Sequence, residues 1–167
     1  MNYIINQLEK NLNVFEHILQ DVDEELIQWR PDTDKWCLLE IVCHLYDEER
    51  LDFRFRTQWT LVRPGEIPPT FNPLEWVEDH DYASQDFRDM LNKFESERIK
   101  SVSWLNGLSN VSWDNAFEHP KLGTLSAAYF LNNWLAHDYL HIRQINRYKY
   151  EYFSLDSDHG LDYAGNW

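Results

Sequence analysis

The sequence predicts an all-α protein, a four-helix bundle, and three observations carry this prediction. Four stretches place apolar residues three and four positions apart, the spacing of one face of an amphipathic helix. No segment shows the strict alternation of apolar and polar residues that is typical of a strand. The chain has 167 residues, 43% of them hydrophobic, which suits one domain with an ordinary core.

The first helix is predicted from about residue 2 to 21. Its apolar face carries Ile4, Ile5, Leu8, Leu12, Phe15 and Leu19. The following segment "WRPDTDKW" contains Pro31 and several potential capping residues, so the helix cannot continue through it.

The second helix is predicted to begin near Cys37 and to reach about Leu61. Asp34 or Cys37 must act as its N-cap, and Glu40 occupies the capping-box position relative to Cys37. A cysteine is a weak cap compared with serine or threonine. The residues that share one face of this helix are Ile41, His44, Leu45, Glu48, Leu51 and Phe55.

A long connection, from about 62 to 83, follows the second helix, and "EWVEDHDYAS" at its end is compatible with a short helical turn. Ser84 is the predicted cap of the third helix, which extends to about residue 106, and Thr124 is predicted to open the fourth. We expect residues 1–150 to form the bundle. The acidic, aromatic tail of residues 151–167 has no helical period and is expected to pack on the bundle.

Charge and cysteine content exclude several classes of function. The net charge of −14 argues against binding to a nucleic-acid backbone or to an anionic membrane. No signal peptide and no apolar stretch of about 18 residues is present, so the sequence predicts a cytoplasmic protein. Cys37 and Cys43 lie six apart on one helix, pointing in different directions, and are expected to stay reduced. A homodimer is plausible because 16% of the residues are aromatic.

Three of the seven histidines lie on apolar helix faces: His44 on the second helix, and His137 and His141 on the fourth. A lone histidine on such a face is most often a hydrogen-bonded core residue. Three of them on two helices invite a common explanation, because one shared metal ion would satisfy a nitrogen of each. His137 and His141 are four apart, so both can reach one ion.

Three imidazole ligands would leave the remaining positions of a divalent ion open for water or substrate. Zinc and nickel are the favoured ions, with iron, cobalt and manganese as alternatives. The rival zinc-peptidase pattern HExxH is not matched, since the residue after His137 is Asp138, whose side chain is too short for that motif's glutamate role.

Glu48 lies one turn after His44 on the same face and is the candidate general base or proton shuttle. The alternative is a glutamate paired with Arg143 or Arg147. Asp47 and Asp138 are alternative acceptors that could orient a ligand imidazole through its second nitrogen.

Two motifs stand out, "WCLLEIVCHLYDEE" in the second helix and "HPKLGTLSAAYFLNNWLAHDYLHIRQI" before and within the fourth. Through them the chain resembles the DinB/YfiT-like superfamily of metal-binding four-helix bundles over roughly residues 1–150. This resemblance implies an up-down-down-up bundle with a long crossover between helices 2 and 3, and a divalent metal ion held by His44, His137 and His141. One departure is Cys37, where this family usually has a serine or threonine after the tryptophan.

The resemblance also implies a small-molecule substrate, since characterised members include transferases and isomerases that use a low-molecular-weight thiol. We therefore expect a metal-dependent enzyme that activates a thiol or water, with thiol S-transfer ranked above hydrolysis on the resemblance alone. The alternative is a non-enzymatic, stress-related bundle in which the metal ion is structural.

Overall fold

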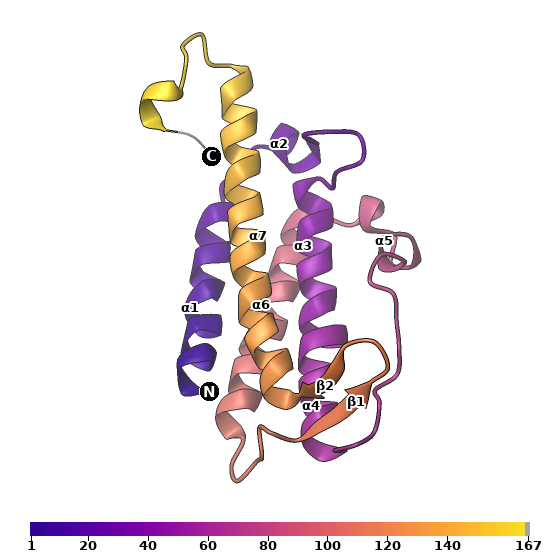
Figure 1. Ribbon diagram of the computed structural model, residues 1–167. Helices are drawn as coiled ribbons and strands as arrows, with labels where there is room; N and C mark the ends of the chain where they lie inside the picture. Colours follow the sequence, from indigo (N-terminus) through magenta and orange to yellow (C-terminus); the bar gives the residue numbers. More distant parts are fainter. Residues whose placement is uncertain (166–167) are drawn as a thin grey trace.

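The computed structural model describes residues 1–165, and its longest helices form an up-down-down-up bundle (Figure 1). In the view of Figure 1, α1 (Asn2–Leu19) ascends and the second bundle helix descends. Next, α6 (Phe87–Gly107) also descends, and α7 (Ala127–Leu155) ascends. The predicted all-α class and the predicted order of the four helices are confirmed.

The second bundle helix consists of three segments without a break between them. They are α3 (Leu38–Asp47), the π-helix η1 (Glu48–Phe53) and α4 (Arg54–Val62). A π-helix has a wider turn than an α-helix and is frequently found at functional sites. Three consecutive carboxylates, Asp47, Glu48 and Glu49, are buried at this junction. The extent of the helix agrees with the prediction, whereas the π-helix was not predicted.

Cys37 is the N-cap of α3, as one of the two predicted alternatives had it. The side chain of Glu40 accepts a hydrogen bond from the backbone N–H of Cys37 at 2.8 Å. Glu40 also forms an ion pair with Arg30, an exposed residue of the segment before the helix. That segment contains a short helix that the sequence did not predict, α2 (Glu24–Gln28).

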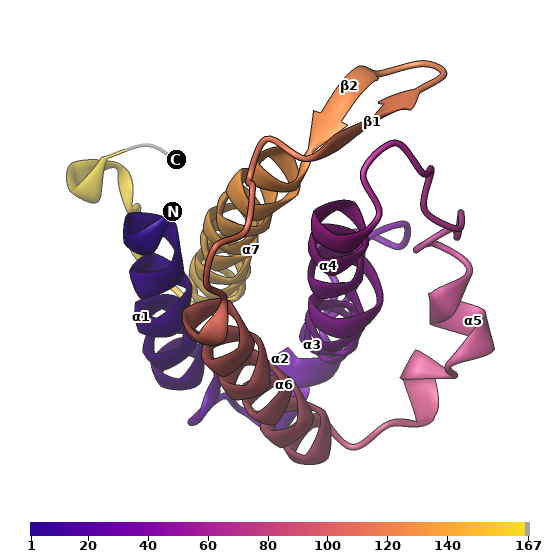
Figure 2. The same ribbon diagram turned by 90° about the horizontal axis from the view of Figure 1, so that it is seen from below.

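The connection between α4 and α6 runs along the bundle (Figure 1), on the outside of α3 and α4 (Figure 2). It contains α5 (Trp76–Asp79) and the 3-10 turn η2 (Tyr82–Ser84), so the predicted helical turn is confirmed. The predicted cap Ser84 is wrong. Ser84 belongs to η2, and Asp86 caps α6 by accepting a hydrogen bond from the backbone N–H of Asp89 at 2.8 Å.

Two short strands, β1 (Ala116–His119) and β2 (Gly123–Ser126), form an antiparallel hairpin that projects beside the start of α7 (Figure 2). The prediction of no strand is therefore wrong. Phe117 and Leu125 face each other across the hairpin and pack with Phe130 in a small buried cluster. The prediction that Thr124 opens the last helix is also wrong, because Ser126 caps it by accepting from the N–H of Tyr129 at 3.1 Å.

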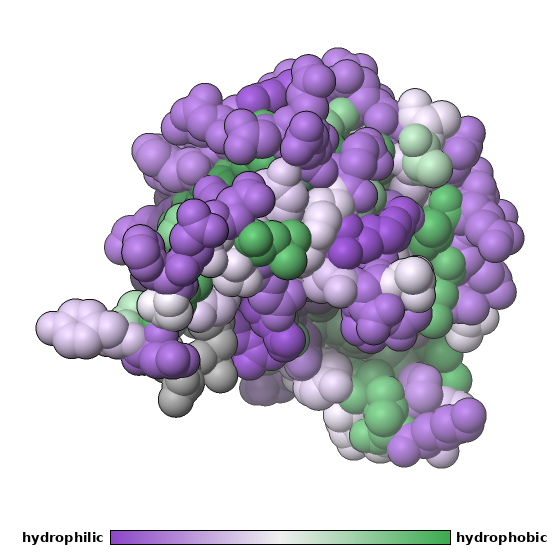
Figure 3. Space-filling view, turned by 90° about the horizontal axis from the view of Figure 1, so that it is seen from above, coloured by the Kyte–Doolittle hydropathy of each residue, from purple (hydrophilic) through white to green (hydrophobic). Residues whose placement is uncertain are grey.

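On α1, α6 and α7 the buried faces are the ones that the apolar spacing indicated. On the second bundle helix Phe53 is buried, whereas the predicted Leu51 and Phe55 are half-buried. Leu8, Phe15 and Leu19 of α1 are fully buried, as is Phe94 of α6. Figure 3 shows that the end of the molecule seen from above is mainly hydrophilic, with apolar residues scattered over it. The last helix continues to Leu155, so the first turn of the expected tail is helical, and the 3-10 turn η3 (Asp162–Ala164) follows. The domain boundary at residue 150 stays a prediction.

Candidate metal centre

The three histidines singled out in the sequence lie together between α3 and α7. The Nε2 atom of His137 lies 3.2 Å from Nε2 of His44 and 3.0 Å from Nε2 of His141. One nitrogen from each ring can be chosen so that all three lie within 4.8 Å of one another. Residues 93 positions apart in the chain thus bring three imidazole nitrogens to one point.

Hydrogen bonds alone do not provide every ring nitrogen of the three histidines with a partner. An imidazole nitrogen offers either one N–H or one lone pair, yet Nε2 of His137 meets two other ring nitrogens at short range. In addition, the buried Nδ1 atoms of His44 and His141 have no hydrogen-bond partner among the described residues. A cation at the point of convergence would accept a lone pair from each Nε2 atom.

The spacing of the nitrogens also fits a metal ion. Two nitrogens bound to a tetrahedral ion at about 2.0–2.1 Å lie roughly 3.3 Å apart. The two short Nε2 distances, 3.0 and 3.2 Å, are close to that value. His44, His137 and His141 could therefore hold a divalent ion with small adjustments of their rings.

Burial keeps all three imidazoles neutral, which is the form that binds metal. Burial, reinforced by the neighbouring His141, lowers the pKa of His44 to about 3. The pKa of His137 falls well below its ordinary value for the same reason, with His141 and His44 adding to the effect of burial. Burial likewise lowers the pKa of His141. The site thus offers lone pairs without first having to release protons at neutral pH.

Aromatic rings form part of the wall around the histidines. The ring of Trp36 lies 4.8 Å from the ring of His44, and the ring of Phe53 lies 5.0 Å from that of His137. Phe53 belongs to the π-helix and stacks on Trp134 on its other side. Apolar walls of this kind lower the local polarity and so strengthen electrostatic interactions inside the site.

Glu48 lies beside the cluster, on the outer side of His44. Its Oε1 atom is 3.9 Å from Nδ1 of His44, which is longer than a hydrogen bond. Burial, together with the nearby charge of Asp52, raises the pKa of Glu48 to about 8. The alternative pairing with Arg147 is not observed, because Arg147 pairs with Glu151.

Asp47 and Asp138 serve other partners and do not orient the histidines. Asp138 is completely buried and accepts two hydrogen bonds from Arg98, each of 2.7 Å, and one from Asn11. Asp47 accepts hydrogen bonds from Arg50, His80 and Tyr82. The expectation that either one binds the second nitrogen of His44, His137 or His141 is wrong.

The sequence analysis missed a buried ionic network next to the histidines. Arg98 of α6 binds Glu49 of η1 as well as Asp138 of α7, and it donates to the backbone carbonyl of Leu8 in α1 at 3.1 Å. Glu49 accepts a further hydrogen bond from Nε1 of Trp134. The network therefore links all four bundle helices. An arginine on the otherwise apolar face of α6 was the signal that could have revealed it.

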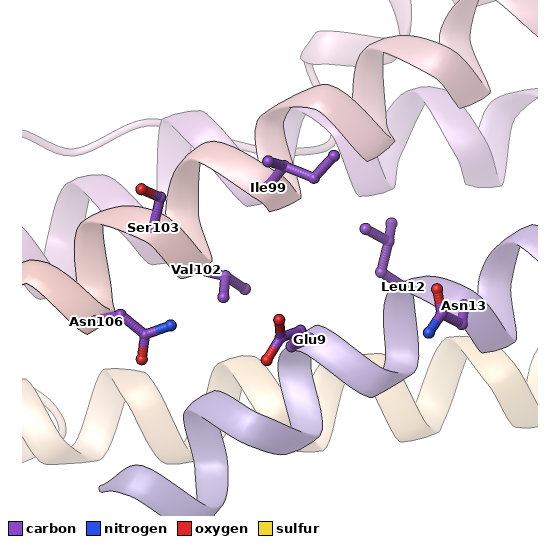
Figure 4. Close-up of a pocket in the computed structure, with 7 residues that line it drawn as sticks. All are labelled: Glu9, Leu12, Asn13, Ile99, Val102, Ser103 and Asn106. Carbon is purple, nitrogen blue, oxygen red and sulfur yellow. The ribbon is translucent and has the colours of Figure 1, made fainter.

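A surface groove of about 400 Å³ between α1 and α6 lies apart from the histidines (Figure 4). Figure 4 shows Glu9, Leu12 and Asn13 on one side, and on the other Ile99, Val102, Ser103 and Asn106. Nothing in this groove resembles the chemistry of the histidine cluster. Among residues 1–165, no helix is long and apolar enough to cross a membrane.

Comparisons with known proteins agree on one family. The family model of the DinB superfamily matches residues 7–145. A solved structure of YfiT from Bacillus subtilis, described as a probable metal-dependent hydrolase with an unusual four-helix bundle topology, superposes with a TM-score of 0.77. The two chains share 17% sequence identity, over 88% of this chain and 84% of YfiT. A search among curated proteins finds no match.

Proposed function

This chain belongs to the DinB superfamily, and from that membership and its three converging histidines we propose that it is a metal-dependent enzyme acting on a small molecule. The single observation that carries the proposal is the meeting of three neutral imidazole nitrogens within 4.8 Å of one another. The description of YfiT as a probable metal-dependent hydrolase supports it.

His44, His137 and His141 would hold the ion through their Nε2 atoms. A divalent ion with open positions lowers the pKa of a coordinated water or thiol and so supplies a nucleophile near neutral pH. Zinc and nickel suit three imidazoles, as do iron and cobalt, while manganese prefers sites richer in oxygen ligands. Trp36 and Phe53 would exclude bulk water from one side of the reacting groups.

Glu48 is the proposed catalytic proton carrier. Its carboxyl group lies next to Nδ1 of His44, and a pKa of about 8 lets it take up and release a proton near neutral pH. A Glu48→Gln variant should retain its metal content and lose the limb of the pH–rate profile that reports this group. An unchanged profile would exclude Glu48 from the proton transfer.

Metal content is the first test of the site. Protein purified without a histidine tag or a chelating column should contain about one divalent ion per chain by element analysis. His44→Ala and His141→Ala should lose it, whereas His17→Ala, which removes an exposed histidine from α1, should not. Equal metal content in all four proteins would refute the assigned ligands.

The nucleophile is the second question, and a paired assay addresses it. Metal-loaded protein is offered an ester panel without thiol, and an electrophile panel with low-molecular-weight thiols. Turnover in the first panel identifies a hydrolase, and thiol-dependent turnover in the second identifies an S-transferase. Inactivity in both, combined with a metal ion that cannot be removed without unfolding, would favour the alternative of a bundle with a structural metal. A cytoplasmic location and a homodimer stay predictions; light scattering on the purified protein tests the dimer.

A further inference from the structure

A second cluster of polar residues surrounds the buried carboxylate of Asp47, on the side of α3 that faces the crossover connection. The carboxylate accepts hydrogen bonds from Nδ1 of His80 at 2.6 Å and from the hydroxyl of Tyr82 at 2.8 Å. Arg50 donates to it as well, also at 2.8 Å. Asp47 is 1% exposed, so these three donors, and not water, stabilise its negative charge.

The hydrogen bond to Asp47 fixes the orientation of His80. Because Nδ1 donates to the carboxylate, Nε2 of the neutral ring is left as a hydrogen-bond acceptor. His80 is one-third exposed and lines a small pocket together with Arg50 and Lys93. The ring also stacks on Trp76, which holds it in place.

The pocket is cationic, although the whole chain carries a net charge of −14. Arg50 and Lys93 line it, and among the described residues Asp47 is its sole acidic lining residue. Lys93 has one further acidic neighbour outside the pocket lining, Asp89, whose carboxylate lies 3.9 Å from its Nζ atom. The lining therefore has more positive than negative charge.

Arg50 has unused hydrogen-bonding capacity. Its guanidinium lies 4.5 Å over the ring of Tyr46, which fixes its plane. Its Nε atom is buried and has no hydrogen-bond partner among residues 1–165. Among residues 1–165, the acceptor bonded to this guanidinium is Asp47, so other N–H groups of its five remain for an acceptor in the pocket.

The volume of the pocket, about 110 Å³, limits the ligand. Sites for drug-sized molecules have roughly 300–1,000 Å³. A pocket this small accommodates one compact group, and planar or tetrahedral oxyanions match the fork of an arginine.

We propose that the pocket between α3, η1, η2 and α6 binds a small oxyanion, the phosphate or carboxylate group of a ligand, through Arg50 and Lys93, with His80 forming part of the wall. None of the three histidines of the candidate metal centre lines it. The inference is therefore independent of the proposed enzymatic function.

Titration calorimetry of the full chain with inorganic phosphate, and separately with acetate, tests the proposal at low ionic strength. We expect saturable binding of at least one anion below about 10 mM. The preferred anion tells whether the natural ligand carries a phosphate or a carboxylate. Absence of saturation with both anions would overturn the proposal.

Lys93→Gln is the central variant, because Lys93 is half-exposed and takes no part in the bonds to Asp47. It should weaken binding on the order of tenfold, the effect of losing one charged donor. Lys100→Gln is the matched control, since it removes the same charge from the same helix two turns away, outside the pocket. Equal weakening by both variants would show a long-range charge effect and refute the site.

Two further variants complete the test. Arg50→Gln should weaken binding at least as much as Lys93→Gln. His137→Ala should leave anion binding unchanged, because His137 lies outside the pocket. Loss of binding in His137→Ala would show that the anion binds at the histidine cluster and would overturn the proposal.

Discussion

Replacing Arg98 by methionine should be among the most destabilising single changes in this protein. The guanidinium is 1% exposed and binds both Glu49 and Asp138, which are equally buried. Methionine fills a similar volume but leaves two carboxylates and the carbonyl of Leu8 without their donor. The variant therefore buries negative charge that no cation compensates.

The expected cost follows from these contacts. Removing one partner of a buried ion pair costs about 3–5 kcal/mol. Arg98 serves two carboxylates at once, so we expect the upper end of that range, about 5 kcal/mol. Since small domains are stable by only about 5–15 kcal/mol, this change would remove from about a third to all of the stability at 25 °C.

Removing all the charges together should restore much of the stability. In the triple variant Arg98→Met, Glu49→Gln, Asp138→Asn this network no longer contains a charge, and replacing a buried ionic group by neutral ones of similar volume is often nearly neutral. The new amides still present oxygen acceptors to Trp134 and Asn11, which now donate to Glu49 and Asp138. We expect the triple variant to lie within about 2 kcal/mol of the natural protein.

Urea unfolding of the metal-free proteins, followed by tryptophan fluorescence and circular dichroism, measures these differences. Arg88→Met, an exposed arginine of the same helix, is the control and should change stability by less than about 0.5 kcal/mol. A cost below about 2 kcal/mol for Arg98→Met, or a triple variant less stable than the single one, would refute the reasoning from buried charge.

Three further predictions concern the histidines and the start of α3. Because the pKa of His44 is lowered to about 3, the unfolded chain binds more protons below about pH 6.5. Metal-free protein should thus lose stability as the pH falls, by about 2 kcal/mol from His44 alone at pH 5. A free energy of unfolding in urea that does not change between pH 7 and pH 5 would contradict this. Zinc or nickel at 100 times its dissociation constant should add about 2.7 kcal/mol of stability, seen as a raised melting temperature that His137→Ala abolishes; an equal rise in the variant would exclude His137 as a ligand. Cys37→Ser should raise the free energy of unfolding by up to about 1 kcal/mol, because a hydroxyl is the better N-cap. Urea unfolding measures the change, and a loss of that size would mean that the packing of the buried thiol matters more.

The helices and the three histidines were predictable because both rest on spacing. Apolar residues three and four positions apart marked the buried faces, and His44, His137 and His141 lay on those faces. Burial of three imidazoles left a shared cation as the simplest common partner, and the structure brings their nitrogens together. The prediction needed only which face each residue occupies, which periodicity gives directly.

The features that were missed depend on contacts between distant segments. Strands of four residues, such as Ala116–His119, are too short for a period of two to stand out from the background. Thr124 and Ser126 are both good caps, and only the hairpin decides that the second one is used. Asp138 looked available to the histidines because its partner, Arg98, lies 40 residues away in the sequence.

The number of residues in the π-helix η1 determines which side chains of the second bundle helix surround the histidines. Each residue of a regular helix advances the direction of the side chain by about 100°, so one residue deleted within Glu48–Phe53 would turn α4 relative to His44 by about that angle. Phe53, now beside His137, would face elsewhere, and Arg54 would lose Ser101 and Glu97. A chain with every histidine retained but one residue fewer here would keep its three clustered histidines and lose the side chains that surround them.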